Sequence, residues 1–245
     1  MRTTNPILNE KAFSRTPAIG AEIMTVNGTV QKTAGLLFLV ICSAAYTWTV
    51  TRVDGASAAA PWAMVGAIAG FILVLVMSFR KHWSPFLAPA YALAEGLFLG
   101  AISAVLEARF RGIVFNAASL TLATLGVLLL VYRMGWIKAT EKFKMGVVAA
   151  TGAIVVVYLV SMVLGMFGRE IPYIHQSGMI GIGFSLFVIV IAALNLVLDF
   201  DFIENGAAHG APRYMEWFAA VGLLVTLVWL YIEFLRLLAK LNSRR

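Results

Sequence analysis

Carboxylates inside apolar runs are the residues of this sequence whose type and position point most directly to chemistry. Glu95 lies in the run AYALAEGLFLG, Asp199 in NLVLDFDF and Glu233 in WLYIEFLRLL. An ionised side chain among apolar residues is costly, so each of these acids needs a partner or a function. They are therefore candidates for a buried site that binds protons or cations.

Glu95 has two interpretations. It lies about ten residues after Pro85, which is about 15 Å along a helix, and so falls near the middle of a hydrocarbon layer of about 30 Å. It is either a carboxylate in an ion pathway or a structural acid that is hydrogen-bonded inside a bundle. Both interpretations stay open at the level of sequence.

Three acids lie close together between Asp199 and Glu204, at the end of an apolar segment. Asp199 and Asp201 are two residues apart, so on a helix their side chains point about 200° apart and cannot both face one partner. One is expected to face the bundle and the other the water interface. Asp199 is deeper in the segment and is the better candidate for the buried position.

Glu233 has a candidate structural partner in Arg236, three residues later on the same helix face. The alternative is a pH-sensing, gating pair with Asp199 or Asp201. Two carboxylates that approach in a low-dielectric interior share one proton. When that proton leaves at high pH, Asp199, Asp201 and Glu233 become candidate ligands for calcium, which prefers carboxylate oxygens. No bound cofactor is expected, and calcium or protons would be the permeant ions.

The composition places these acids in a membrane protein. Hydrophobic residues make up 61% of the chain and charged residues 13%, against about 45–50% and about 25% in soluble domains. Seven apolar segments approach the length of about 20 residues that a spanning helix needs: 33–51, 60–79, 85–106, 113–133, 146–167, 178–201 and 216–240. The prediction is an all-α, polytopic bundle of seven transmembrane helices over residues 33–245, after a polar segment at 1–32.

Basic residues indicate the orientation. If the seven segments alternate in direction, Lys32, Arg80, Lys81, Arg133 and Lys138 all fall on one side of the membrane. Because Lys and Arg gather in cytoplasmic loops, that side and the N-terminus are predicted to be cytoplasmic. The basic residues near the C-terminus would then lie outside, so a re-entrant last segment is the alternative.

Glycines at intervals of four residues predict close contacts between membrane helices. Gly66 and Gly70 form one such pair, and Gly96 and Gly100 form a second. The glycines at 178, 181 and 183 are expected to act in the same way.

Two classes of function are not favoured. His82, His175 and His209 fall in separate loops, and no nucleophile, metal-ligand or phosphate-binding motif is present, so an enzyme is not expected. The net charge of +7 is explained by loops that flank a membrane, so nucleic acid is not an expected partner. The single cysteine, Cys42, lies in an apolar run and is expected to be a packing residue.

The sequence resembles the Bax inhibitor-1 family, specifically its bacterial branch, from about residue 30 onward. Members carry an Asp-Thr-Gln motif in the sixth helix and a motif of the type LYLDFI in the last. LDFDFI at 198–203 and LYIEFL at 230–235 stand in these places. The resemblance implies a seven-helix fold with a central last helix, and a carboxylate pair that gates a pH-sensitive calcium leak.

Carried over to this chain, the pair would be Asp199 with Glu233. Phe200 and Asp201 replace the Thr and Gln of the family motif, so Asp201 is the alternative partner. The family also has an arginine in its second helix that can pair with an acid, and Arg80 is the nearest residue to that place.

Three functions remain open. The first is a cation leak channel in the plasma (inner) membrane. The second is a proton-coupled carrier. The third is a non-transporting regulator that binds a membrane protease or a stress complex. The lipid bilayer is a partner in all three.

Overall fold

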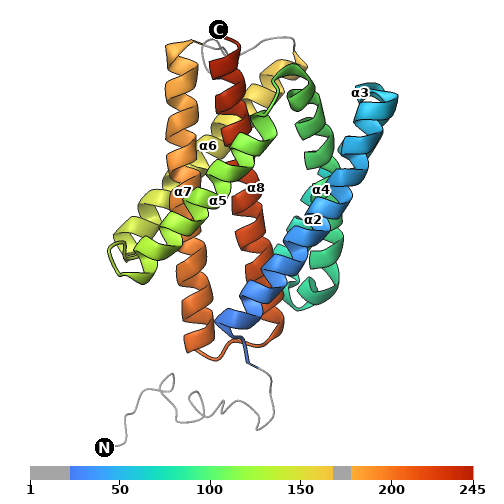
Figure 1. The fold of residues 1–245 in the computed structure, drawn as a ribbon. Coiled ribbons are helices and arrows are strands. Elements are labelled where there is room, and N and C mark those ends of the chain that lie inside the picture. Colours follow the sequence, from blue (N-terminus) through green and yellow to red (C-terminus); the bar gives the residue numbers. More distant parts are fainter. Residues whose placement is uncertain (1–22, 168–177, 245) are drawn as a thin grey trace, which may run out of the picture.

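Seven long helices form a bundle in the computed structural model, which describes residues 23–167 and 178–244 (Figure 1). They are α2 (Val26–Asp54), α3 (Ala56–Phe79), α4 (Ser84–Arg109), α5 (Ile113–Arg133), α6 (Glu141–Met166), α7 (Met179–Ala208) and α8 (Tyr214–Asn242), with a short 3₁₀ helix, η1 (Lys81–Trp83), before α4. Each of the seven is long and apolar enough to cross a membrane. The chain is therefore an all-α, multi-pass membrane protein. Most of the polar N-terminal segment and His175 lie outside the described residues.

Successive helices run in opposite directions, so the two ends of the bundle have different loops. Helices α2 and α8 both begin at the lower end in Figure 1, called here the N-side end, and α8 finishes at the upper, C-side end. Helix α8 is continuous over 29 residues, about 43 Å at 1.5 Å per residue. It therefore crosses the membrane, and the re-entrant alternative is wrong.

The first helix begins at Val26 rather than at residue 33. Thr25 has an extended backbone and its hydroxyl accepts a hydrogen bond from the Gly28 amide at 2.9 Å, which satisfies one of the free donors of the first turn. The residues from Val26 to Lys32 were expected to belong to the polar segment, because they carry few large apolar side chains. They are helical because this end of α2 is held against α8, as described below.

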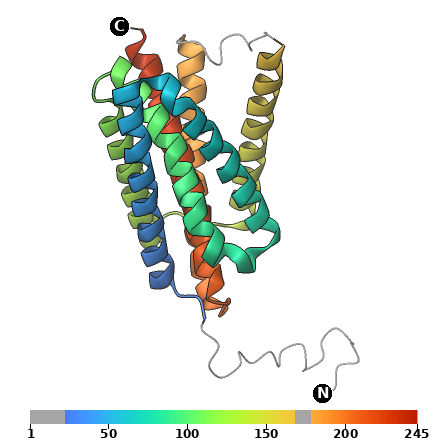
Figure 2. The same cartoon turned by 90° about the vertical axis from the view of Figure 1, so that its right-hand side faces the viewer.

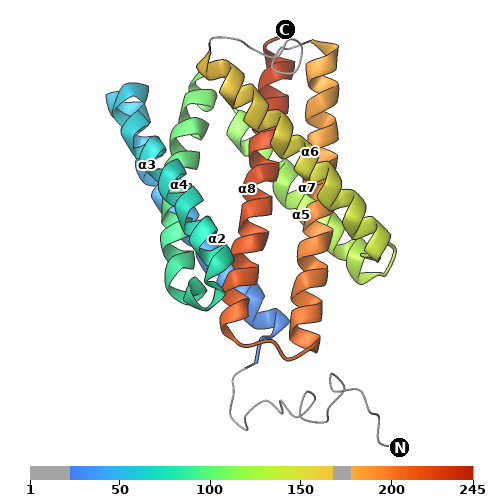
Figure 3. The same ribbon diagram turned by 180° about the vertical axis from the view of Figure 1, so that it is seen from behind.

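Helix α8 occupies the centre of the bundle. It packs against α2, α4, α5 and α7, and Figure 3 shows it between α4 and α7. Of its most apolar stretch, 67% is buried, whereas the other helices have 11–50% of theirs buried. Helix α6 packs on α7 at the periphery (Figure 2). Polar side chains on α8 are therefore the ones most completely removed from lipid and water.

Glycines permit close contacts between α2, α3 and α4. A Cβ atom on Gly96 would lie 1.9 Å from the Ser43 hydroxyl and 2.3 Å from the Val40 carbonyl oxygen, and one on Gly66 would lie 2.4 Å from the Ala94 carbonyl oxygen. The prediction for the glycine pairs in these helices is confirmed. It is wrong for Gly178 and Gly183, where an added Cβ would meet no atom within 4 Å.

Replacement of Gly96 by alanine is expected to lower the free energy of unfolding by about 1–3 kcal/mol, the usual cost of overpacking a tight contact. The methyl group would meet the backbone of α2, which cannot move without displacing the whole helix. Thermal unfolding in detergent measures the effect. Gly126→Ala is the matched control, because an added Cβ there meets nothing within 4 Å, and equal effects of the two substitutions would contradict the close contact.

Candidate functional site

Glu233 lies deep in the bundle on α8, with 1% of its surface exposed. Its Oε1 atom accepts hydrogen bonds from Arg236 Nη1 and from the Tyr158 hydroxyl, both at 2.7 Å. The Arg236 guanidinium also donates to the Tyr158 oxygen at 2.5 Å and lies 5.0 Å from the centre of its ring. The structural partner suggested by the i, i+3 spacing is therefore present, and Tyr158 on α6 completes a three-residue cluster.

Asp199 on α7 faces a different part of α8. Its carboxylate lies within hydrogen-bonding reach of Thr226, and its Oδ1 atom is 4.0 Å from the position of a Cβ built on Gly222. The Thr226 hydroxyl also donates to the Gly222 carbonyl oxygen at 3.3 Å. The Asp199 carboxylate thus lies against the part of α8 that carries Gly222 and Thr226.

Asp199 and Glu233 are not in direct contact. Glu233 is seven residues beyond Thr226, about 10 Å further along the helix axis, and its partners differ from those of Asp199. The two acids nevertheless share one property. Asp199 Oδ2 and Glu233 Oε2 are the two buried side-chain oxygens without a hydrogen-bond partner in the part of the chain that the structure describes. They form a series along α8 rather than a pair.

Asp201 and Glu204 lie on other faces of α7. Asp201 forms an ion pair with Lys144 of α6 at 2.8 Å, and Glu204 accepts a hydrogen bond from the Tyr132 hydroxyl at 2.6 Å. The three acids suggested as calcium ligands are thus held by separate partners. No cluster of three metal-ligating side chains occurs within residues 23–167 and 178–244. The reason is the two-residue spacing of Asp199 and Asp201, which turns them to different neighbours.

Glu95 lies at the contact between α3 and α4. Its carboxylate is hydrogen-bonded to Tyr91, one turn earlier on α4, and its Oε2 atom is 3.1 Å from the position of a Cβ on Gly70. Its role in an ion pathway stays a prediction, and in this structure it is a half-buried acid beside a close helix contact.

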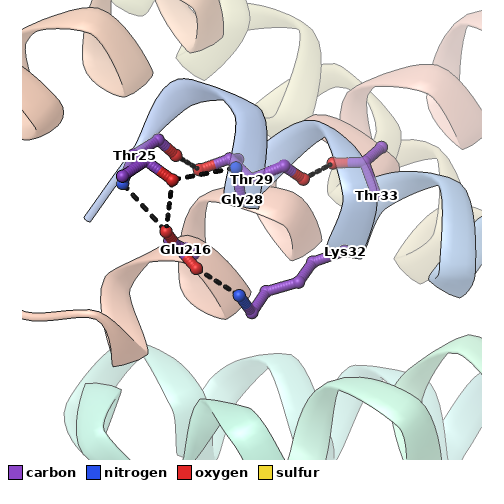
Figure 4. Close-up of polar contacts among 6 residues, drawn as sticks. All are labelled: Thr25, Gly28, Thr29, Lys32, Thr33 and Glu216. Atoms are coloured by element: carbon purple, nitrogen blue, oxygen red, sulfur yellow. Dashed lines mark hydrogen bonds and ion pairs between the residues drawn. The ribbon is translucent and has the colours of Figure 1, made fainter. Parts of the chain in front are cut away.

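A cluster at the N-side end joins the start of α2 to the start of α8 (Figure 4). Glu216 is 2% exposed. Its Oε1 atom accepts hydrogen bonds from the Thr25 amide at 2.8 Å and the Thr25 hydroxyl at 2.9 Å, and its Oε2 atom is ion-paired with Lys32. A Cβ on Gly28 would lie 2.2 Å from Oε1. We call Thr25, Gly28, Lys32 and Glu216 the N-side clasp.

Backbone contacts extend the N-side clasp to the turn between α7 and α8. The Met24 amide donates to the Ala211 carbonyl oxygen at 2.7 Å, and Ile23 forms an isolated antiparallel bridge with Pro212. The beginning of the first helix is thus fixed to the loop that precedes the last.

Basic residues line a cavity of about 660 Å³ at the C-side end, between α3, α4 and α8. Arg109, Arg236 and Lys240 contribute to its wall. Lys240 also donates to the Gly181 carbonyl oxygen and to the Ser185 hydroxyl, each at 2.9 Å, and so ties α8 to α7. Glu233 therefore lies about one helical turn from this positively charged cavity, on the side toward the N-side end.

Sequence reasoning identified the two orphaned acids but missed the residues that surround them. Tyr158, Thr226 and the N-side clasp were not candidates, because a hydroxyl or an acid near a helix end is unremarkable in sequence. The Thr25-x-x-Gly28 cap was the one available signal for the clasp, and it does not indicate a partner 191 residues away.

The sequence matches the model of the family described as "Bax inhibitor 1 like" over residues 5–243, which is nearly the full chain. No curated protein and no solved structure matches the chain.

Proposed function

The chain belongs to the Bax inhibitor 1 like family, and from this premise we propose that it is a pH-sensitive cation leak channel with calcium as a permeant ion. The conducting path follows α8, and Asp199 and Glu233 act as two successive carboxylate sites along it. The protein performs no catalytic step in this proposal.

The observation that carries the proposal is the pair of buried carboxylate oxygens without partners. A buried polar atom that is left unsatisfied costs about 1–3 kcal/mol, and more if it is charged. Such a cost at two places, at Glu233 on α8 and at Asp199 on the neighbouring α7, favours a function over a structural role. Calcium needs six to eight oxygen ligands, so water and backbone carbonyls would supply the rest at each site.

The pH dependence follows from the surroundings of Asp199. Within the described chain no cation forms an ion pair with it, so its charged form is poorly compensated in the apolar interior. The carboxyl loses its proton as the pH rises, and a cation then gains an ionised ligand. Calcium flux is therefore expected to increase with pH.

Two sets of polar contacts, one at each end of the proposed path, would keep it closed at rest. The N-side clasp holds α2 against the start of α8. At the other end, Arg236 neutralises Glu233 and occupies its Oε1 atom. A leak at a low resting rate is the behaviour expected of a path with a closed contact at each end.

The charges of the loops support an orientation with the N-side end in the cytoplasm, and the membrane that we propose is the plasma (inner) membrane. Arg80, Lys81, Arg133 and Lys138 all lie at or near this end, in agreement with the positive-inside tendency. A reporter that fluoresces only in the cytoplasm should therefore give no signal when it is fused to the C-terminus.

Calcium flux into liposomes tests the proposal. The purified protein is reconstituted around a calcium indicator, and influx is measured between about pH 5 and pH 8. Flux should rise with pH in the native protein. Asp199→Asn should remove most of this pH dependence and lower the flux at high pH by about tenfold, which corresponds to about 1.4 kcal/mol in the barrier. Glu233→Gln should also change the flux.

Glu141→Gln is the control for the loss of a carboxylate, because Glu141 is 86% exposed at the start of α6. Absence of calcium flux in the native protein, or flux that is unchanged in both Asp199→Asn and Glu233→Gln, overturns the proposal.

A further inference from the structure

A groove of about 960 Å³ opens between α2, α5 and α7 toward the N-side end of the bundle. Its walls are apolar, with Val30 and Leu37 from α2, Leu125 and Leu129 from α5, and Leu223 from α8 at its base. The helices that form it span a membrane, so the molecule nearest to an open apolar groove is a lipid.

The mouth of the groove carries two cations. Arg133 ends α5 and Lys138 lies in the turn that follows; both line the groove and both are exposed. Among the described residues neither has an ion pair. Trp136 lies between them in the sequence and is 76% exposed. Exposed tryptophan is typical of the level of lipid headgroups, so the two cations lie where the phosphates of a bilayer lie.

The mouth also carries the carboxylate of Glu204, which has one oxygen available to bind a ligand. Two acids line the groove, Asp201 and Glu204. Asp201 is neutralised by Lys144 at 2.8 Å. Glu204 is exposed, and its Oε2 atom accepts a hydrogen bond from Tyr132 at 2.6 Å. Glu204, Arg133 and Lys138 all line this groove, so the acid and the two cations share one cavity.

We propose that this groove binds a phospholipid whose headgroup carries both a phosphate and a primary ammonium, as phosphatidylethanolamine does. An acyl chain lies along the apolar wall between α2 and α5. The phosphate binds Arg133 and Lys138. Hydrogen bonds between these cations and a phosphate are charge-assisted, and so are stronger than hydrogen bonds between neutral groups. The ammonium donates to the Glu204 carboxylate.

The two signs of charge select among lipids. An anionic lipid without an ammonium satisfies Arg133 and Lys138 but leaves Glu204 against a negative headgroup. A trimethylammonium headgroup has no N–H to donate to Glu204. The inference goes beyond the proposed channel, because it concerns a separate groove and requires no ion flux.

Native mass spectrometry of the purified full chain tests the site. The protein is incubated with equal amounts of phosphatidylethanolamine, phosphatidylcholine and phosphatidylglycerol with identical acyl chains, and the retained lipid is measured. The native protein should retain the ethanolamine lipid about tenfold over each of the others, the ratio that about 1.4 kcal/mol produces.

Variants of the mouth separate the two contacts. The double substitution Arg133→Gln and Lys138→Gln should reduce the retention of all three lipids. Glu204→Gln should abolish the preference for phosphatidylethanolamine over phosphatidylglycerol while a lipid is still retained. The control is Arg80→Gln with Lys81→Gln, which removes the same charge from the same end of the bundle outside the groove.

A second pair of variants tests the acyl-chain position. Ala34→Phe fills the groove from α2, whereas Cys42→Phe adds the same bulk to an exposed position of α2 that lies outside the groove. Retention should fall in the first alone. Equal retention of the three lipids by the native protein, or no loss on removal of Arg133 and Lys138, overturns the inference.

Discussion

Replacement of Glu216 by glutamine is expected to lower the free energy of unfolding by about 3 kcal/mol. The substitution keeps the shape of the side chain but removes the charge that compensates Lys32, and both groups are largely withdrawn from solvent. Breaking one partner of a buried ion pair costs about 3–5 kcal/mol, because the other charge is left uncompensated. Unfolding in mixed detergent micelles measures the change.

A double-mutant cycle isolates the contact between Glu216 and Lys32. The combination of Glu216→Gln with Lys32→Met should cost less than the sum of the two single changes, because no charge is then left behind. Glu141→Gln, at an exposed pair with Lys144, should change the stability by less than about 1 kcal/mol. Strict additivity of the two clasp substitutions would falsify a direct coupling.

Replacement of Arg236 by glutamine is expected to raise the calcium leak at neutral pH by about tenfold, equivalent to about 1.4 kcal/mol in the barrier. The guanidinium now cancels the charge of Glu233 at 2.7 Å and presents a positive charge to any cation that enters from the C-side cavity. Its removal leaves a carboxylate free to bind a cation. The liposome assay described above measures the change.

Arg109→Gln is the control for this second prediction. Arg109 lines the same cavity and carries the same charge, but it lies over the ring of Phe110 and forms no ion pair with Glu233. Its loss should change the leak much less. An equal rise in both variants would show that the net charge of the cavity matters and that the Arg236–Glu233 contact does not.

The fold could be predicted from the sequence because hydropathy alone defines a spanning helix. Seven segments of sufficient length and apolarity were evident, and seven helices cross the bundle. The starts of helices were harder to predict. Helix α2 extends back to Val26 because Thr25 and Lys32 meet Glu216, and that contact depends on a residue at the far end of the chain.

The candidate site was predicted only in its parts. Asp199 and Glu233 could be recognised one at a time, since an acid in an apolar run is costly wherever it lies. Their separation could not be predicted, because it depends on how far α7 and α8 slide along each other. Helical periodicity fixes which side chains share a face, but it does not fix the relative position of two helices along their axes. The contact of Asp199 with Gly222 and Thr226 depends on that relative position.

The central position of α8 has a consequence for biogenesis. The ribosome synthesises the chain from its N-terminus. Helix α8, which fills the middle of the bundle, therefore enters the membrane after the other six helices. Helices α2, α3 and α4 pack closely on one another through their glycines and have the contacts to associate early. Lys32, in contrast, can form its ion pair with Glu216 only after a further 184 residues have been synthesised.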